Sequence, residues 1–479
     1  MTRSPSRSSA MRSCGVFATA LLVSVLGLGT AEAQSIPGES PALGDRITQA
    51  EVEAARTPGQ LREIRRAGMR IFTTPFNRLD GYGDGPSNPA DPVTPGGRPT
   101  IQNGDTPFLR FNGLDAQTCL ECHGVLSFDT VPALNAVGGT AGFSASPFPR
   151  LTQIDGADAN GNGIAEVNGR VINPPINFGG GGVALAGKEM TLDLQQLRAD
   201  AVASPGVRIA LLTKGIDFGS IVCQADGSCD TSQVEGVGSD LVVRPFGRKG
   251  EFTTTRAFDL GATMFHLGMQ PVEVVGEGVD ADGDGVSNEL LVGELSALSI
   301  FLEGLEPPQQ FPRRLRGQAA RGFDIFQDIG CSDCHIPALT TDSPILTFSF
   351  PQVDADPDAN VYQSLDLRRQ GFPRDRDGRG VVVELFADLK RHDMGDSLAE
   401  TTGSDLDRLF TTARLWGVAD TAPYLHDGRA LTLTDAILLH DGEGRPARDR
   451  FAALRDPDRV AVLRFLRTLR NPARPNRGL

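Results

Sequence analysis

The chain contains few of the aromatic residues that form aromatic cores and few of the cysteines that form disulfide frameworks. Its 479 residues include one tryptophan, three tyrosines and seven cysteines, and aromatic side chains make up only 6%. With 56 glycines and 32 prolines, this composition predicts many turns and loops rather than long sheets. The length is sufficient for two domains, each with a core of its own.

Basic residues are in the minority. The sequence has 46 lysines and arginines against 60 aspartates and glutamates, which gives a formal net charge of −14. An acidic surface repels the phosphates of nucleic acids and anionic lipids. We therefore expect no nucleic-acid partner, and only weak attraction to basic proteins at physiological salt.

Long apolar runs are also missing after the first 33 residues. Basic residues open this segment, an apolar stretch covers about residues 16–28, and Ala31-Glu32-Ala33 precedes Gln34. The stretch is shorter than the roughly 18 to 20 residues of a membrane span. It predicts a cleaved secretory signal over residues 1–33, with a membrane anchor as the alternative. We expect a periplasmic protein without a membrane anchor.

Six cysteines follow this segment, and two of them lie close together in "CQADGSC" as Cys223 and Cys229. Exported proteins meet an oxidising compartment, in which such a pair forms a disulfide. We predict a small structural loop closed by this bond.

The chain repeats one plan. Residues 67–72, "AGMRIF", and 321–326, "RGFDIF", each precede a Cys-x-x-Cys-His motif, and residues 295–305 and 459–469 share a Phe-Leu-x-x-Leu ending at helical spacing. Prolines in the segment 306–314 interrupt the helical pattern between the two copies. We predict two domains, residues 34–306 and 307–479.

The two motifs carry the most specific chemistry in the sequence. Cysteines at i and i+3 reach the two vinyl groups of one haem, and the following histidine approaches the iron from one face. A thioredoxin-like pair, a zinc knuckle and an ordinary disulfide are the alternatives, although zinc would gather all four cysteines at one site. We predict two covalent c-type haems in two cytochrome c-like domains, mainly α, with long loops and short strands inserted in the first. The haem-binding residues are Cys119, Cys122, His123, Cys331, Cys334 and His335.

The second ligands of the two irons are less clearly marked. "RPFGRKGEFTTTRAFDLGATMFH" ends at His266 and "APYLHDGRALTLTDAILLH" ends at His440, and each combines a glycine turn, a threonine and a helical run. The duplicated plan favours these two histidines over the remaining histidines and methionines.

A different kind of site is suggested by "VDADGDGVSNE". Carboxylates at i, i+2 and i+4 ahead of a turn glycine converge on a hard cation in calcium loops. The residues are Asp280, Asp282 and Asp284, and Glu289 would close the site from a shorter loop than usual. The alternative is a solvated acidic turn.

The segments "FQDIGCSDCHIP", "RHDMGDSLAE" and "RLWGVADTAPYLHDGRALTLTDAILLHDGEG" resemble the carboxy-terminal half of the bacterial di-haem cytochrome c peroxidase superfamily, most closely its di-haem oxidoreductase group. The resemblance is strong over about residues 322–469 and holds only in outline over residues 68–305. It implies that His440 is the second ligand of the electron-transfer haem, with Met394 in reserve. It also implies that carbonyls of Thr421 and Pro423 help to hold a structural calcium, together with an asparagine that the sequence does not identify.

In the first half, the resemblance places His266 near the distal acid–base glutamate of the peroxidases, and Glu273 in "QPVEVVG" is the alternative acid–base group. No histidine follows His123 closely, so the reversible second ligand of the peroxidases is missing. This leaves either an open first haem or a His123/His266 ligand pair.

Three functions are consistent with these features. The first is a peroxidase-like oxidoreductase that reduces hydrogen peroxide, or another small oxidant, at the first haem and exchanges electrons with a small redox protein through the second. The second is a di-haem electron-transfer cytochrome without substrate chemistry. The third is an oxidase or oxygenase on the same scaffold.

Overall fold

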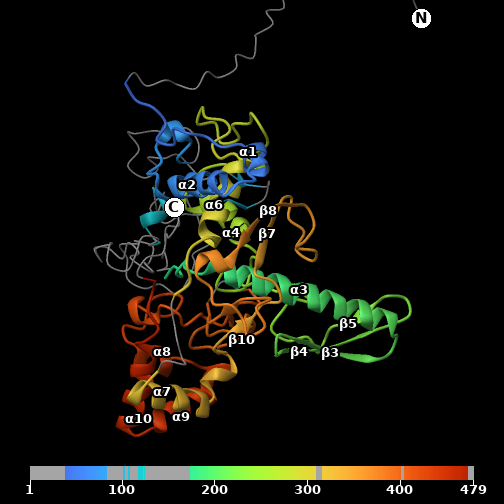
Figure 1. Ribbon diagram of the computed structural model, residues 1–479, viewed down its shortest axis with the longest axis vertical. Coiled ribbons are helices and arrows are strands. Elements are labelled where there is room, and N and C mark those ends of the chain that lie inside the picture. The colour runs from blue at the N-terminus through green and yellow to red at the C-terminus, as the bar shows by residue number, and fades with distance from the viewer. Residues whose placement is uncertain are drawn as a thin grey trace, which may run out of the picture.

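The computed structural model describes residues 38–83, 101–102, 106–107, 117–121, 123, 173–308, 315–400 and 404–472 (Figure 1). The predicted signal segment 1–33 lies outside these ranges, as does Cys122 of the first motif. In the described ranges, no helix is long and apolar enough to cross a membrane.

The first half of the chain contributes six described α-helices. They are α1 (Gln49–Ala54), α2 (Pro58–Thr73), α3 (Gly180–Ala203), α4 (Thr255–Ala262), α5 (Val272–Val275) and α6 (Val292–Glu303). A capping box starts α2, in which the Thr57 side chain accepts from the Gln60 N–H and Gln60 accepts from the Thr57 N–H. Proline at position 58 suits the first turn, where its missing N–H costs nothing.

The second half contributes α7 (Gly317–Asp328), α8 (Leu433–Leu438), α9 (Arg445–Ala453) and α10 (Asp456–Leu466). Figure 1 shows α7, α9 and α10 grouped at one end of the molecule, and α1, α2 and α6 grouped toward the other.

The predicted repeat is confirmed by one packing contact that occurs twice. Helix α2 packs on α6 and α7 packs on α10. A Cβ on Gly68 would overlap the carbonyl of Ala297, and a Cβ on Gly322 would overlap the carbonyl of Ala461. Equivalent glycines therefore allow equivalent helix pairs to approach closely.

Short antiparallel strands lie in both halves. The first half has β1 (Ile101–Gln102) paired with β2 (Thr106–Pro107), and a sheet of β3 (Arg208–Thr213), β4 (Ile216–Cys223) and β5 (Cys229–Asp230). In Figure 1 this sheet and α3 project together from the body. Cys223 pairs with Cys229 in the sheet register and the two form the predicted disulfide.

The short strands predicted for the first half are confirmed, and the second half carries strands that the sequence did not predict. The pairs are β6 (Leu339–Thr340) with β9 (Val382–Val383), β7 (Ile345–Ser349) with β8 (Val361–Asp366), and β10 (Arg391–Asp393) with β11 (Leu409–Thr411). They fill the long stretch between the second motif and α8. The fold is a mixture of helices and short strands rather than mainly α.

Two hydrophobic clusters form the core. One surrounds Phe326, Phe386 and Phe465 in the second half. The larger cluster combines α2, α3 and α6 with the strands β6 to β9. Core packing therefore joins the two halves of the sequence, and the domain bounds 34–306 and 307–479 stay a prediction.

Candidate functional site

The described residues of the two Cys-x-x-Cys-His motifs share one local structure. Each begins in a short 3₁₀ turn, Cys119–Glu121 or Cys331–Asp333. The His123 N–H donates to the Cys119 carbonyl (2.9 Å), and the His335 N–H donates to the Cys331 carbonyl (3.0 Å). This turn brings each histidine back over its first cysteine.

The surroundings of the two histidines also match. The rings of Phe72 and His123 have centroids 6.4 Å apart, and those of Phe326 and His335 are separated by the same 6.4 Å. These phenylalanines end the repeated sequence that precedes each motif, so the helix pairs described above position both histidines.

Both motif histidines are oriented for metal binding through Nε2. His123 Nδ1 lies 3.0 Å from the Pro175 carbonyl, and His335 Nδ1 lies 3.1 Å from the Phe386 carbonyl. A metal-bound histidine commonly donates its other ring N–H to such an acceptor. Desolvation lowers the pKa of each to about 4, which keeps the imidazoles neutral and able to bind a metal. The residues present therefore fit a haem iron at each motif.

His440 lies opposite His335. Their ring centroids are 6.3 Å apart in a T-shaped arrangement, and His440 Nδ1 lies 2.8 Å from the Ala436 carbonyl. An imidazole nitrogen lies about 2 Å from a metal that it binds, so two imidazoles on one ion place their centroids roughly 6 Å apart. The spacing suits one iron between the two rings.

Met394, the reserve ligand, lies beside His440 rather than in its place. A Cβ on Gly444 would lie 3.2 Å from both His440 Cβ and Met394 Cε. Met394 Cε and the His440 side chain therefore lie close together, and the ring contact with His335 is made by His440.

In the first half, the structure brings His266 near His123. Helix α4 continues into a π-helical turn, Thr263–Leu267, which contains His266 and ends at left-handed Gly268. Desolvation lowers the pKa of His123, the hydrogen bond to Pro175 raises it, and the charge of His266 lowers it. Turns of this type are rare and concentrate at functional sites.

Glu273 is held in an ion pair. Arg256 donates from Nη1 to Glu273 Oε1 (3.1 Å) and from Nη2 to Oε2 (2.7 Å), and both side chains are largely buried. A carboxylate fixed by two such bonds is poorly suited to exchanging a proton with a substrate.

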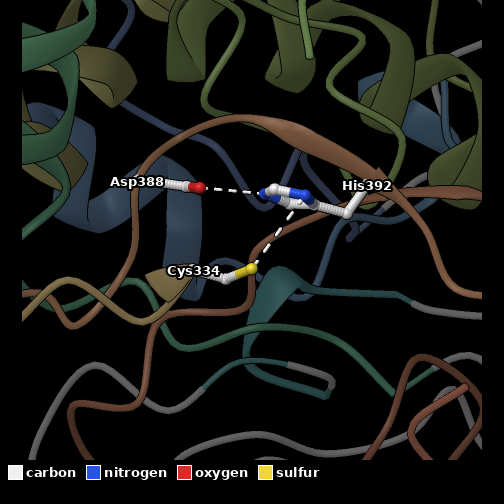
Figure 2. A group of neighbouring side chains, drawn as sticks. All are labelled: Cys334, Asp388 and His392. Atoms are coloured by element: carbon white, nitrogen blue, oxygen red, sulfur yellow. Dashed lines mark hydrogen bonds and ion pairs between the residues drawn. The ribbon is translucent and has the colours of Figure 1, made fainter. Parts of the chain in front are cut away.

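Asp388 and His392 lie beside the second motif, as Figure 2 shows. His392 Nε2 lies 2.8 Å from Asp388 Oδ2, and His392 Nδ1 lies 2.7 Å from Glu443 Oε2 and 4.0 Å from Cys334 Sγ. Burial opposes the charged form, but the hydrogen bonds to Asp388 and Cys334 raise the pKa of His392 to about 11.

Cys334, Asp388 and His392 could together hold a metal ion. This requires a free thiolate, whereas covalent haem attachment uses the same sulfur. Covalent haem attachment and binding of a separate metal ion are therefore mutually exclusive at Cys334. No local pattern marks Asp388 in the sequence, because its proximity to Cys334 depends on the folding of the chain between them.

Asn173 is a second residue that the sequence analysis did not find. Its Nδ2 donates to the carbonyls of Pro423 (2.7 Å) and Leu425 (2.9 Å), and its Oδ1 is buried without a hydrogen-bond partner among the described residues. If the side-chain amide of Asn173 were flipped, Oδ1 instead of Nδ2 would lie beside the two carbonyls, and three oxygen atoms would converge. Asn173 therefore contacts Pro423, one of the two residues of the predicted calcium site, and calcium binding at Thr421 and Pro423 stays a prediction.

Two solved structures are similar to parts of this chain. Hydrazine synthase from Kuenenia stuttgartiensis is 18% identical, with 53% of this chain and 78% of that chain covered and a TM-score of 0.29. A MauG-like protein associated with microbial copper homeostasis is 14% identical, with 60% and 87% covered and a TM-score of 0.27. No curated protein matches the sequence.

A protein-family model matches residues 376–469, a segment that includes Asp388, His392, Met394, Thr421, Pro423 and His440. The family is described as "Di-haem oxidoreductase, putative peroxidase". Over this segment the match confirms the resemblance that the sequence motifs indicated, and it supports a di-haem oxidoreductase.

Proposed function

We propose that the chain is a periplasmic di-haem c-type oxidoreductase that reduces hydrogen peroxide. Cys119, Cys122 and His123 would hold one haem, and Cys331, Cys334 and His335 the other. The observation that carries the proposal is the asymmetry between two matched motifs. His440 faces His335 at the spacing of a ligand pair, whereas the first motif has His266 nearby on a π-helical turn.

The second site is suited to electron transfer alone. His335 and His440 would occupy both faces of the iron, which leaves no position for a substrate. A His/His ligand pair also favours a lower potential than His/Met, because the axial ligand is a main determinant of haem potential. A small redox protein would deliver its electrons here.

The first site is suited to chemistry. Bound haem would supply the iron and electrons for cleaving the oxygen–oxygen bond. Overall, one peroxide, two electrons and two protons give two waters. The chain must move a proton from the near oxygen to the leaving oxygen, and a histidine performs this exchange well around neutral pH. His266 is the candidate, and Glu273 is disfavoured by its ion pair with Arg256.

The alternative is an electron-transfer cytochrome. The same proximity of His266 to His123 supports it, because direct binding of His266 would close the first site as well. An oxidase or oxygenase has no separate observation in its favour.

The test is the His266→Ala variant, with haem content measured for each preparation. As an acid–base group, His266 is needed for peroxide turnover but not for the spin state of the oxidised protein. Loss of turnover with an unchanged spin state supports the proposal. Conversion of a low-spin signal to a high-spin one identifies His266 as a ligand and contradicts it.

A further inference from the structure

Three aspartates converge in the loop after α5. Asp280, Asp282 and Asp284 each offer a carboxylate oxygen, and these oxygens all lie within 4.8 Å of one another. Asp282 is buried, with 7% of its surface exposed. Left-handed glycines at 283 and 285 turn the chain between and after the aspartates.

A fourth carboxylate is enclosed beside them. Glu289 is 2% exposed, its Oε2 accepts from the Gln270 N–H (2.6 Å), and its buried Oε1 has no hydrogen-bond partner among the described residues. Gly81 lies against this side chain with φ +90°, and a Cβ there would overlap it. Glu289 is therefore held in place with one oxygen unused.

Two carboxylate oxygens of this loop are buried without a hydrogen-bond partner among the described residues, Asp284 Oδ2 and Glu289 Oε1. Buried polar atoms are normally paired, and leaving them unpaired costs free energy. A cation bound where the three aspartates converge would supply the missing partner.

We propose that Asp280, Asp282, Asp284 and Glu289 bind one calcium ion. All donors are oxygens, which selects a hard cation, and four carboxylates around flexible glycine turns suit Ca²⁺ better than the rigid octahedron of Mg²⁺. Glu289 reaches the site from the tenth position of the loop, two residues earlier than in an EF-hand. The site is separate from the one suggested at Asn173, Thr421 and Pro423.

The loop is connected to the segment that follows His266. Besides the Glu289–Gln270 bond, the Ala281 N–H donates to Gln270 Oε1 (3.1 Å), and the Val272 N–H donates to the Leu290 carbonyl (2.9 Å). Calcium would thus fix the chain between the π-helical turn and α5. An effect of calcium on peroxide turnover would rest on the proposed function, whereas calcium binding itself does not depend on that function.

The test is calcium binding by the holoprotein after treatment with a chelator. Titration calorimetry with Ca²⁺ should show a site that Asp284→Asn removes. Calcium at about 5 mM, above the dissociation constants of roughly 10⁻⁴–10⁻³ M of extracellular modules, should raise the Tm of the wild type by about 5 °C. In chelator, D284N should melt at a higher temperature than the wild type, because one repelling charge is gone.

Two further variants complete the test. Glu289→Gln should also lose this calcium site, which covers the case in which D284N fails to fold. Asp226→Asn, in an exposed turn, should retain the full calcium shift. A wild type that binds no Ca²⁺, or a shift of unchanged size in both D284N and E289Q, would overturn the proposal. Because neither readout involves peroxide, an inactive protein that still binds calcium would contradict only the proposed function.

Discussion

The ring centroids of His335 and His440 lie 6.3 Å apart in a T-shaped arrangement, and each ring has its Nδ1 beside a backbone carbonyl. The remaining nitrogen of each ring is Nε2, the atom expected to bind iron. Burial lowers the pKa of both imidazoles, so no proton competes for these nitrogens near neutral pH. The pair arises from segments more than 100 residues apart in the sequence.

Replacing His440 should open the second site. In the reduced His440→Ala protein, carbon monoxide is expected to bind one haem more than in the wild type, as measured by the optical difference spectrum. The matched control is Met394→Ala, which alters the neighbouring side chain and should bind carbon monoxide as the wild type does. If M394A opens the site and H440A does not, Met394 is the ligand.

His266 and Glu273 should differ in their importance for peroxide turnover. His266→Gln should lower kcat/KM by about 10²–10⁴-fold, the usual contribution of a general acid–base group. Glu273→Gln should lower it less than about tenfold, because Arg256 already engages both oxygens of that carboxylate. Steady-state rates at saturating electron donor measure both. The reverse order would make Glu273 the acid–base group.

The repeated helix contact should be sensitive to a single methyl group. Gly68→Ala and Gly322→Ala each place a Cβ into a backbone carbonyl of the partner helix, and we expect each to lower the free energy of unfolding by about 1–3 kcal/mol. Gly261→Ala is the control, because Gly261 lies in α4 with nothing within 4 Å of an added Cβ. It should stabilise the protein by about 0.5–1 kcal/mol. Denaturant titration measures all three, and equal effects at the three positions would contradict the packing argument.

Asp259 should make the stability depend on pH. Burial, followed by the charge of Glu303, raises the pKa of this carboxyl well above its usual range, and its Oδ2 has no hydrogen-bond partner in the described part of the chain. A raised folded-state pKa means that stability is full below the unfolded pKa near 3.9 and falls as pH rises above it, by about 1.4 kcal/mol per pH unit until the folded pKa is reached.

Asp259→Asn should remove this loss. The variant should equal the wild type near pH 4 and become progressively more stable than the wild type toward pH 7, as measured by denaturant titration. Asp458→Asn should show the opposite sign, because Arg321 holds the pKa of Asp458 below its usual range. A pH-independent difference at Asp259 would mean that its carboxyl is not enclosed.

The sequence predicted those parts of the structure that depend on local spacing. The Cys-x-x-Cys-His turns, the repeated helices around Gly68 and Gly322, and the disulfide of Cys223 all follow from residues close together in the chain. It did not reveal that Asn173 meets Pro423, because a contact across 250 residues leaves no local pattern.

The strands of the second half show a different limit. In β7, buried Leu346 and Phe348 alternate with less buried neighbours, which is the period of a strand. The run is only five residues long, and it lies between the second motif and α8, a stretch for which the sequence predicted no strand. This run forms a strand because it pairs with β8. That pairing is a tertiary contact, which local sequence does not reveal.

Low-temperature electron paramagnetic resonance of the oxidised holoprotein distinguishes a peroxidase from an electron-transfer cytochrome. We expect two c-type haems per chain. One should be low-spin with both faces closed by His335 and His440. The other should give a high-spin signal that changes when hydrogen peroxide is added. Two low-spin haems that do not respond to peroxide would contradict the proposed function, and would identify the chain as an electron-transfer cytochrome.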